Sequence, residues 1–213
     1  MGILDTDSFM HGASGKIGGI VLYTVDGKTY FRQHVPQHAD ARTEKQLLQR
    51  QRLITAQTLF QSVKNCLLYD VFSLAAVQQH RRSGYHLFLK LNTNACGKDY
   101  TIDYSLLTFS QGQLQLPFNF RLSGSNDRQA EFTWSNCQEQ TTARGSDRLQ
   151  VAAIFPDEPF RVKILPGIDA VRKDGYATVP LEKRPGGEVH LYCFFARSDL
   201  KSFSDNRYFC INR

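Results

Sequence analysis

The stretch Gly12-Ala-Ser-Gly-Lys-Ile-Gly-Gly-Ile-Val-Leu-Tyr-Thr-Val-Asp-Gly-Lys-Thr-Tyr-Phe-Arg-Gln33 decides how the chain begins to fold. Its glycine-rich start predicts a flexible loop, followed by apolar segments over 17–25 and 28–35. Asp26-Gly27 between these segments favours a two-residue type I′ turn, because both turn positions need positive φ. We therefore predict a β-hairpin over 17–35. A lone hairpin is marginally stable in water, so this one needs a surface to pack against.

The segment after the hairpin has the pattern of a helix. Thr43 and Gln46 have the spacing of a capping box. Apolar residues then recur at helical spacing: Leu53, Ala56, Phe60, Val63, Leu67 and Val71. We predict a helix that ends near residue 68, followed by shorter helical pieces over 73–80 and from Ser83.

From Tyr100 onward the apolar period changes to two, which is typical of strands. Turn signals separate short candidate strands, as in a β-sandwich. The candidates are residues 100–104, 114–122, 130–135, 149–155, 160–165, 176–180, 189–196 and 208–211. We predict an α+β chain with a hairpin and helices over 1–95 and an immunoglobulin-like antiparallel β-sandwich over 98–213.

The charge of the chain is concentrated in its first half. The net charge is +6. Residues 1–95 contain 11 Lys and Arg against 6 Asp and Glu, whereas residues 96–213 contain 15 against 14. A basic surface can attract nucleic acid or an acidic protein, although a solvated helix face has the same composition.

Known catalytic motifs are absent from the sequence. Gly12, Gly15, Gly18 and Gly19 with Lys16 lack the spacing of a phosphate-binding loop, and a strand follows them instead of a helix. Pro36 separates His34 from His38, and His80, His86 and His190 are isolated in the sequence, so we predict no metal site and no cofactor. Glycosidase-type carboxylates could still be assembled by the fold.

Cysteine usage and hydropathy bear on the compartment. The 5 cysteines are scattered and form no Cys-x-x-Cys pair, which favours reduced thiols in the cytoplasm. The chain shows neither a secretory signal nor an apolar run of about 18 residues that would cross a membrane.

The N-terminal block resembles a family of bacterial proteins of unknown function, about 200 residues long. The resemblance is carried by the following residues: Gly15, Lys16, Gly18, Val21, Tyr23, Gly27, Tyr30, Arg32, Pro36, Thr43, Gln46 and Arg50. It extends to Tyr100–Ser105 and Phe132–Asn136. The resemblance implies no activity.

The last 80 or so residues loosely resemble a fibronectin type III or immunoglobulin-like domain. Trp134 stands where such domains have a core tryptophan, and Pro185–Ala196 is similar to their turn and penultimate strand. Val189 stands where the tyrosine corner of these domains would have its tyrosine. Such domains are commonly binding or spacer modules.

We expect a non-enzymatic structural or adaptor protein that binds other proteins, because tyrosine and arginine are favoured at contact hot spots. The expected partner-binding residues are Tyr23, Tyr30, Arg32, Arg42, Lys45, Arg50 and Arg52. The alternative is association with nucleic acid, in which Arg81 and Arg82 would also contact phosphates and Tyr23, Tyr30 or Phe31 would stack on bases. A third possibility is an enzyme with its site in the sandwich loops.

Overall fold

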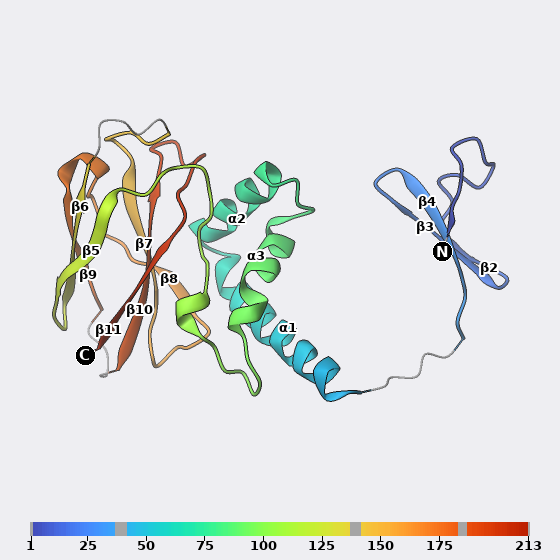
Figure 1. Ribbon diagram of the computed structural model, residues 1–213, viewed down its shortest axis with the longest axis horizontal. Coiled ribbons are helices and arrows are strands. Elements are labelled where there is room, and N and C mark those ends of the chain that lie inside the picture. The colour runs from blue at the N-terminus through green and yellow to red at the C-terminus, as the bar shows by residue number, and fades with distance from the viewer. Residues whose placement is uncertain (1, 37–41, 137–141, 183–186, 213) are drawn as a thin grey trace. The chain divides into compact units, whose positions relative to one another are not determined.

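The computed structural model describes residues 2–36, 42–136, 142–182 and 187–212. Cys137, His38 and most of the turn at 185–187 lie outside these residues. Helices and antiparallel strands make this a mixed α+β protein, as predicted (Figure 1). The chain divides into two compact units, Met1–Thr43 and Glu44–Arg213.

The N-terminal unit is an antiparallel sheet with the strand order β1-β4-β3-β2. Its strands are β1 (Gly2–Ile3), β2 (Gly15–Ile17), β3 (Ile20–Val25) and β4 (Lys28–Gln33). The predicted hairpin is present as β3 and β4, and Asp26 and Gly27 have φ values of 50° and 75°. A second hairpin was missed: Ile17 pairs with Ile20, so Gly18-Gly19 is a two-residue turn and not part of a loop.

The helices of the C-terminal unit are α1 (Glu44–Val63), α2 (Leu67–Gln78) and α3 (Gly84–Asn92). The first helix therefore ends five residues before the predicted residue 68. A Cβ on Gly84 would lie 2.9 Å from the Phe72 carbonyl carbon, so glycine lets α3 begin against the backbone of α2. None of the described helices combines the length and the hydropathy needed to cross a membrane.

The strands of the C-terminal unit form two antiparallel sheets. The sheet β5-β6-β9 contains β5 (Phe118–Ser125), β6 (Gln129–Ser135) and β9 (Tyr176–Pro180). The sheet β11-β10-β7-β8 contains β7 (Arg148–Ile154), β8 (Val162–Ile164), β10 (Glu188–Ala196) and β11 (Arg207–Asn212). Short 3-10 helices lie at Thr93–Ala95, Tyr104–Leu106 and Arg172–Asp174. The predicted strand over 100–104 is absent, and only Ile102 makes an isolated bridge, to Cys96.

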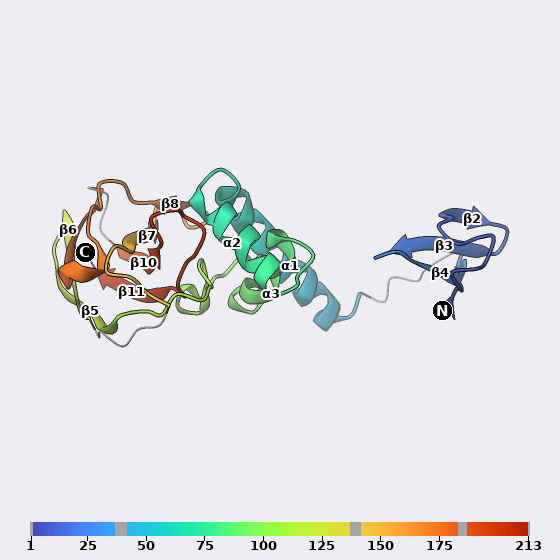
Figure 2. The same ribbon diagram turned by 90° about the horizontal axis from the view of Figure 1, so that it is seen from above.

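Strand β10 separates two apolar cores. Side chains alternate across a strand, and every residue from Val189 to Ala196 is buried. Leu191, Cys193 and Phe195 belong to a core shared with the β5-β6-β9 sheet. Tyr192 and Phe194 belong to a second core shared with α1, α2 and α3. Figures 1 and 2 show the same order of layers, with the helices on one side of β7 and β10 and with β5, β6 and β9 on the other.

The observed division differs from the expected boundary between 1–95 and 98–213. The helices share a core with Ala152, Ile154, Tyr192 and Phe194 of the β11-β10-β7-β8 sheet, so they belong to the same compact unit as the strands. Only the N-terminal sheet is separate. Periodicity shows that a helix has an apolar face, but it does not show which partner covers that face.

The two cores of β10 can be tested with Phe194→Ala and Phe195→Ala, which each truncate a fully buried ring in a different core. We expect each variant to lose about 3–5 kcal/mol of unfolding free energy, measured by denaturant titration with circular dichroism. Phe118→Ala is the matched control, because Phe118 is 50% exposed, and it should lose less than about 1 kcal/mol. If Phe194→Ala lowers the unfolding free energy no more than Phe118→Ala does, Phe194 does not belong to a packed core beneath the helices.

Candidate functional site

The N-terminal sheet gathers three of the predicted partner-binding residues on one face. In the β3–β4 register Tyr23 pairs with Tyr30, and Val21 pairs with Arg32. Residues two apart on a strand share a face, so Tyr30 and Arg32 lie on the same side as Tyr23. The two tyrosine rings stack with centroids 5.6 Å apart and an interplanar angle of 17°. We call this surface, made by Tyr23, Tyr30 and Arg32, the tyrosine face.

The opposite face of the same sheet is apolar. It carries a groove of about 190 Å³ lined by Leu4, Met10, Ile17, Ile20, Leu22 and Phe31. Leu22 is 4% exposed, whereas Ile17, Ile20 and Phe31 are exposed. The sheet therefore has one face of tyrosine and arginine and one apolar face that its own loops cover only in part.

The predicted basic residues around the first helix do not form one surface. Lys45 and Arg50 are exposed and lie near the start of α1. The buried residues of this helix begin only at Thr55. Residues seven apart share a helix side, so Arg52 lies on the side of Lys45, and Arg50 points elsewhere. Arg42 precedes the helix with a φ of 43°. Arg52 is half-buried and lines a cleft of the C-terminal unit.

This cleft has a volume of about 540 Å³. Its walls come from α1, from the segment between Asn94 and Leu106, and from β10 and β11. Arg52 lies at the wall formed by Cys96, where its charge partly opposes the rise in the thiol pKa that burial causes. Glu188, His190 and Tyr208 line the cleft from the strands.

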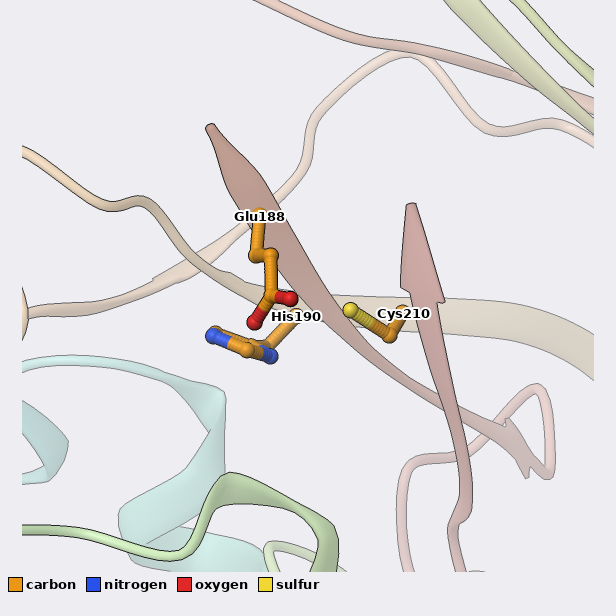
Figure 3. Close-up of side chains that lie close together, drawn as sticks. All are labelled: Glu188, His190 and Cys210. Atoms are coloured by element: carbon orange, nitrogen blue, oxygen red, sulfur yellow. The ribbon is translucent and has the colours of Figure 1, made fainter. Parts of the chain in front are cut away.

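On the paired strands β10 and β11, Glu188 and His190 of the cleft wall meet Cys210, and one ligand atom of each residue lies within 4.8 Å of the other two. Figure 3 shows the Glu188 carboxylate beside the His190 ring, with the Cys210 sulfur directed toward both. His190 is 6% exposed, whereas Glu188 and Cys210 are exposed. Carboxylate, imidazole and thiol are the groups that bind zinc-type cations in proteins.

Two tyrosines fix the His190 ring. Tyr104 stacks on it with centroids 3.9 Å apart and an interplanar angle of 12°. The His190 Nδ1 atom and the Tyr208 hydroxyl share a hydrogen bond of 2.9 Å. Burial lowers the pKa of His190, and the charge of Glu188 partly opposes this. The ring is thus held neutral and in one orientation.

The thiol and phenol groups of this wall stay protonated at neutral pH. Burial is the largest cause of the raised pKa of Cys210, and the Glu188 charge adds to it. Burial, followed by hydrogen bonding with Cys210, likewise raises the pKa of Tyr208. A protonated thiol is a poor nucleophile, and it must lose its proton before it can bind a cation.

No local sequence pattern points directly to this cluster. Glu188 and His190 are two residues apart, but Cys210 comes from another strand and reaches His190 only because β10 and β11 pair antiparallel. In the sequence alone, His190 is therefore isolated from other ligand residues. Two sequence features could have indicated the cluster. They are the Glu-x-His spacing, which puts both side chains on one strand face, and a cysteine in the last strand.

A second cleft, of about 700 Å³, lies against the helices. Lys64, Arg81 and Arg82 contribute cations to its lining, and Tyr69 and Tyr85 contribute aromatic rings. The Gln57 side-chain amide donates to the Tyr85 hydroxyl at 2.7 Å. This cleft brings together the two arginines named above for nucleic-acid contact.

The hydrogen bond between Tyr208 and His190 can be tested with Tyr208→Phe. Removing the hydroxyl leaves His190 Nδ1 without its partner at a buried position, so we expect a loss of about 1–3 kcal/mol of unfolding free energy. Tyr176→Phe removes a hydroxyl from a residue that is 65% exposed and should change stability by less than about 0.5 kcal/mol. If the two variants lower the unfolding free energy equally, the hydrogen bond between Tyr208 and His190 does not stabilise the fold.

Comparison with known proteins adds a family and one weak structural similarity. No curated protein matches the chain. The fibronectin type-III domain of human fibronectin type III domain containing protein 3, solved in solution, is 14% identical, with a TM-score of 0.33, and the match covers 48% of this chain and 90% of that one. Residues 12–210 match a family of unknown function, DUF6266. The chain therefore belongs to the DUF6266 family.

Proposed function

We propose that this chain is a non-enzymatic docking protein whose N-terminal sheet binds another protein. The observation that carries this proposal is the small core of that sheet. Among the described residues of the N-terminal unit, Leu22 is the only buried apolar side chain, and the other buried residue is Thr29. Units of about 40 residues seldom bury enough apolar surface to be stable without further support.

The surface of the sheet supports the same proposal. Its exposed apolar residues are Ile3, Phe9, Ile17, Ile20, Val25, Phe31 and Val35. Phe9 is 92% exposed. Exposed apolar residues gathered on one small unit are typical of a surface that a partner covers. A position inside a multi-subunit assembly would provide such cover.

The tyrosine face suits the core of a protein interface. Tyrosine and arginine are enriched among residues that contribute most to binding, because they bury a large area and retain polar groups that can be satisfied. The stacked pair of Tyr23 and Tyr30 is already ordered, so it would lose little side-chain entropy on binding. We propose that Tyr23, Tyr30 and Arg32 contact the partner directly.

We propose that the two sheets of the C-terminal unit form an immunoglobulin-like sandwich that serves as a scaffold. The support is their common core, in which Phe120 and Trp134 of one sheet contact Phe195 of the other at centroid distances of 5.8 Å and 5.4 Å. The described cysteines are free thiols, which agrees with the proposed location in the cytoplasm of a bacterial cell.

Association with nucleic acid is the second candidate, and the helical cleft favours it. Lys64, Arg81 and Arg82 there could contact phosphates, and Tyr69 or Tyr85 could stack on a base. Such binding would weaken steeply with salt, since each phosphate contact releases counterions.

The docking proposal is tested by capture of the tagged full chain at native level, with and without nuclease, followed by mass spectrometry. We expect a stoichiometric set of proteins whose capture is unaffected by nuclease. In the double variant Tyr23→Ala/Tyr30→Ala, the captured amount of these proteins should fall at least about tenfold, because hot-spot residues are lost. The control is Tyr176→Ala, which removes an exposed tyrosine from the other unit and should capture the same set.

Two outcomes would contradict this proposal. If the partners disappear after nuclease treatment and Arg81→Ala/Arg82→Ala releases them, nucleic-acid association takes its place. If both tyrosine variants capture the same proteins in the same amounts, the tyrosine face is not the docking surface.

A further inference from the structure

We propose that Glu188, His190 and Cys210 form a binding site for a divalent zinc-type cation. The three side chains are brought to one place by the pairing of β10 with β11, in which His190 lies directly opposite Cys210. Glu188 is two residues before His190 and therefore projects from the same face of the sheet. This site is independent of the docking proposal, because it lies in the C-terminal unit.

The ligand set is one that zinc accepts. Zinc binds thiolate sulfur, imidazole nitrogen and carboxylate oxygen at about 2.0–2.3 Å and prefers tetrahedral geometry. Those bond lengths place ligand atoms about 3.5 Å apart. The ligand atoms here lie within 4.8 Å of one another, so no pair of them has to approach by more than about 1.3 Å. Glu188 and Cys210 are exposed and can make this adjustment by side-chain rotation.

The histidine is already arranged as a ligand. Metal-bound histidines usually hydrogen-bond through their second ring nitrogen, which fixes the ring and its tautomer. The Tyr208 hydroxyl makes such a bond with Nδ1 of His190, and Tyr104 stacks on the ring. Within the described part of the chain, Nε2 makes no hydrogen bond, so coordination through this nitrogen would keep the Tyr208 bond, whereas coordination through Nδ1 would replace it.

The charges of the site balance on binding. Cys210 must release its proton to bind as thiolate, and the cation supplies the driving force for that release. A divalent cation with one thiolate and one carboxylate is electrically neutral, which limits the desolvation penalty at this half-buried wall. Glu188 and His190 line the cleft of about 540 Å³, from which water or a small ligand could supply a fourth coordination partner.

The test is titration of the chelator-treated full chain with Zn²⁺ by calorimetry and with Co²⁺ by absorption spectroscopy. We expect one equivalent to bind and a thiolate-to-cobalt charge-transfer band to appear. Cys210→Ser and Glu188→Gln change exposed residues and should preserve the fold, which circular dichroism checks. Each variant should weaken Zn²⁺ binding at least about tenfold, because loss of a direct ligand costs more affinity than loss of an outer-shell partner. Cys210→Ser should also abolish the charge-transfer band.

Cys66→Ser is the matched control, since Cys66 is another free thiol of the C-terminal unit and lies at the start of α2. It should bind Zn²⁺ like the unaltered chain and keep the cobalt band. The proposal is overturned if the unaltered chain binds no equivalent of either cation, or if Cys210→Ser or Glu188→Gln weakens binding less than tenfold. Loss of binding in Cys66→Ser would also overturn it.

Discussion

Burial of β10 on both faces is the constraint on which the rest of the C-terminal unit depends. A strand with alternating side chains can be apolar throughout only if each face has its own cover. Phe195 packs against Phe120 and Trp134 of the opposite sheet, while Tyr192 packs with Phe109 beneath the helices. Helices and sheets therefore stabilise one another through β10 and its neighbour β7, which also contributes side chains to both cores. Removing either layer would expose one face of β10.

The candidate cation site lies where this double burial ends. Val189 still points into the core between the sheets, but Glu188 is exposed at the start of the strand, and His190 lies between the covered and the open part of the other face. Tyr192, the next residue on that face, donates from its buried hydroxyl to the Tyr104 carbonyl at 2.7 Å. Tyr104 in turn stacks on His190. The core beneath the helices thus orients the histidine.

Local patterns predicted most of the elements. Asp26-Gly27 placed the β3–β4 hairpin, and strand β9 runs over the predicted residues Tyr176–Pro180. Three features were not predicted. They are the sheet that covers the helices, the second hairpin at Gly18-Gly19, and the contact of His190 with Cys210. These depend on which strand pairs with which, and a single sequence does not encode that pairing in its periodicity. The predicted partner residues separated accordingly, with Tyr23, Tyr30 and Arg32 on one face and Arg52 in a cleft of the other unit.

The most direct test of the coupling between the two cores is denaturant unfolding of the full chain, followed by two probes in one titration. The single tryptophan, Trp134, lies in the core between the sheets, and its fluorescence reports on that core. Far-ultraviolet circular dichroism reports chiefly on α1, α2 and α3. Because β10 couples the two cores, we expect coincident transitions with one midpoint. Loss of the helical signal at a clearly lower denaturant concentration than the change in fluorescence would contradict it.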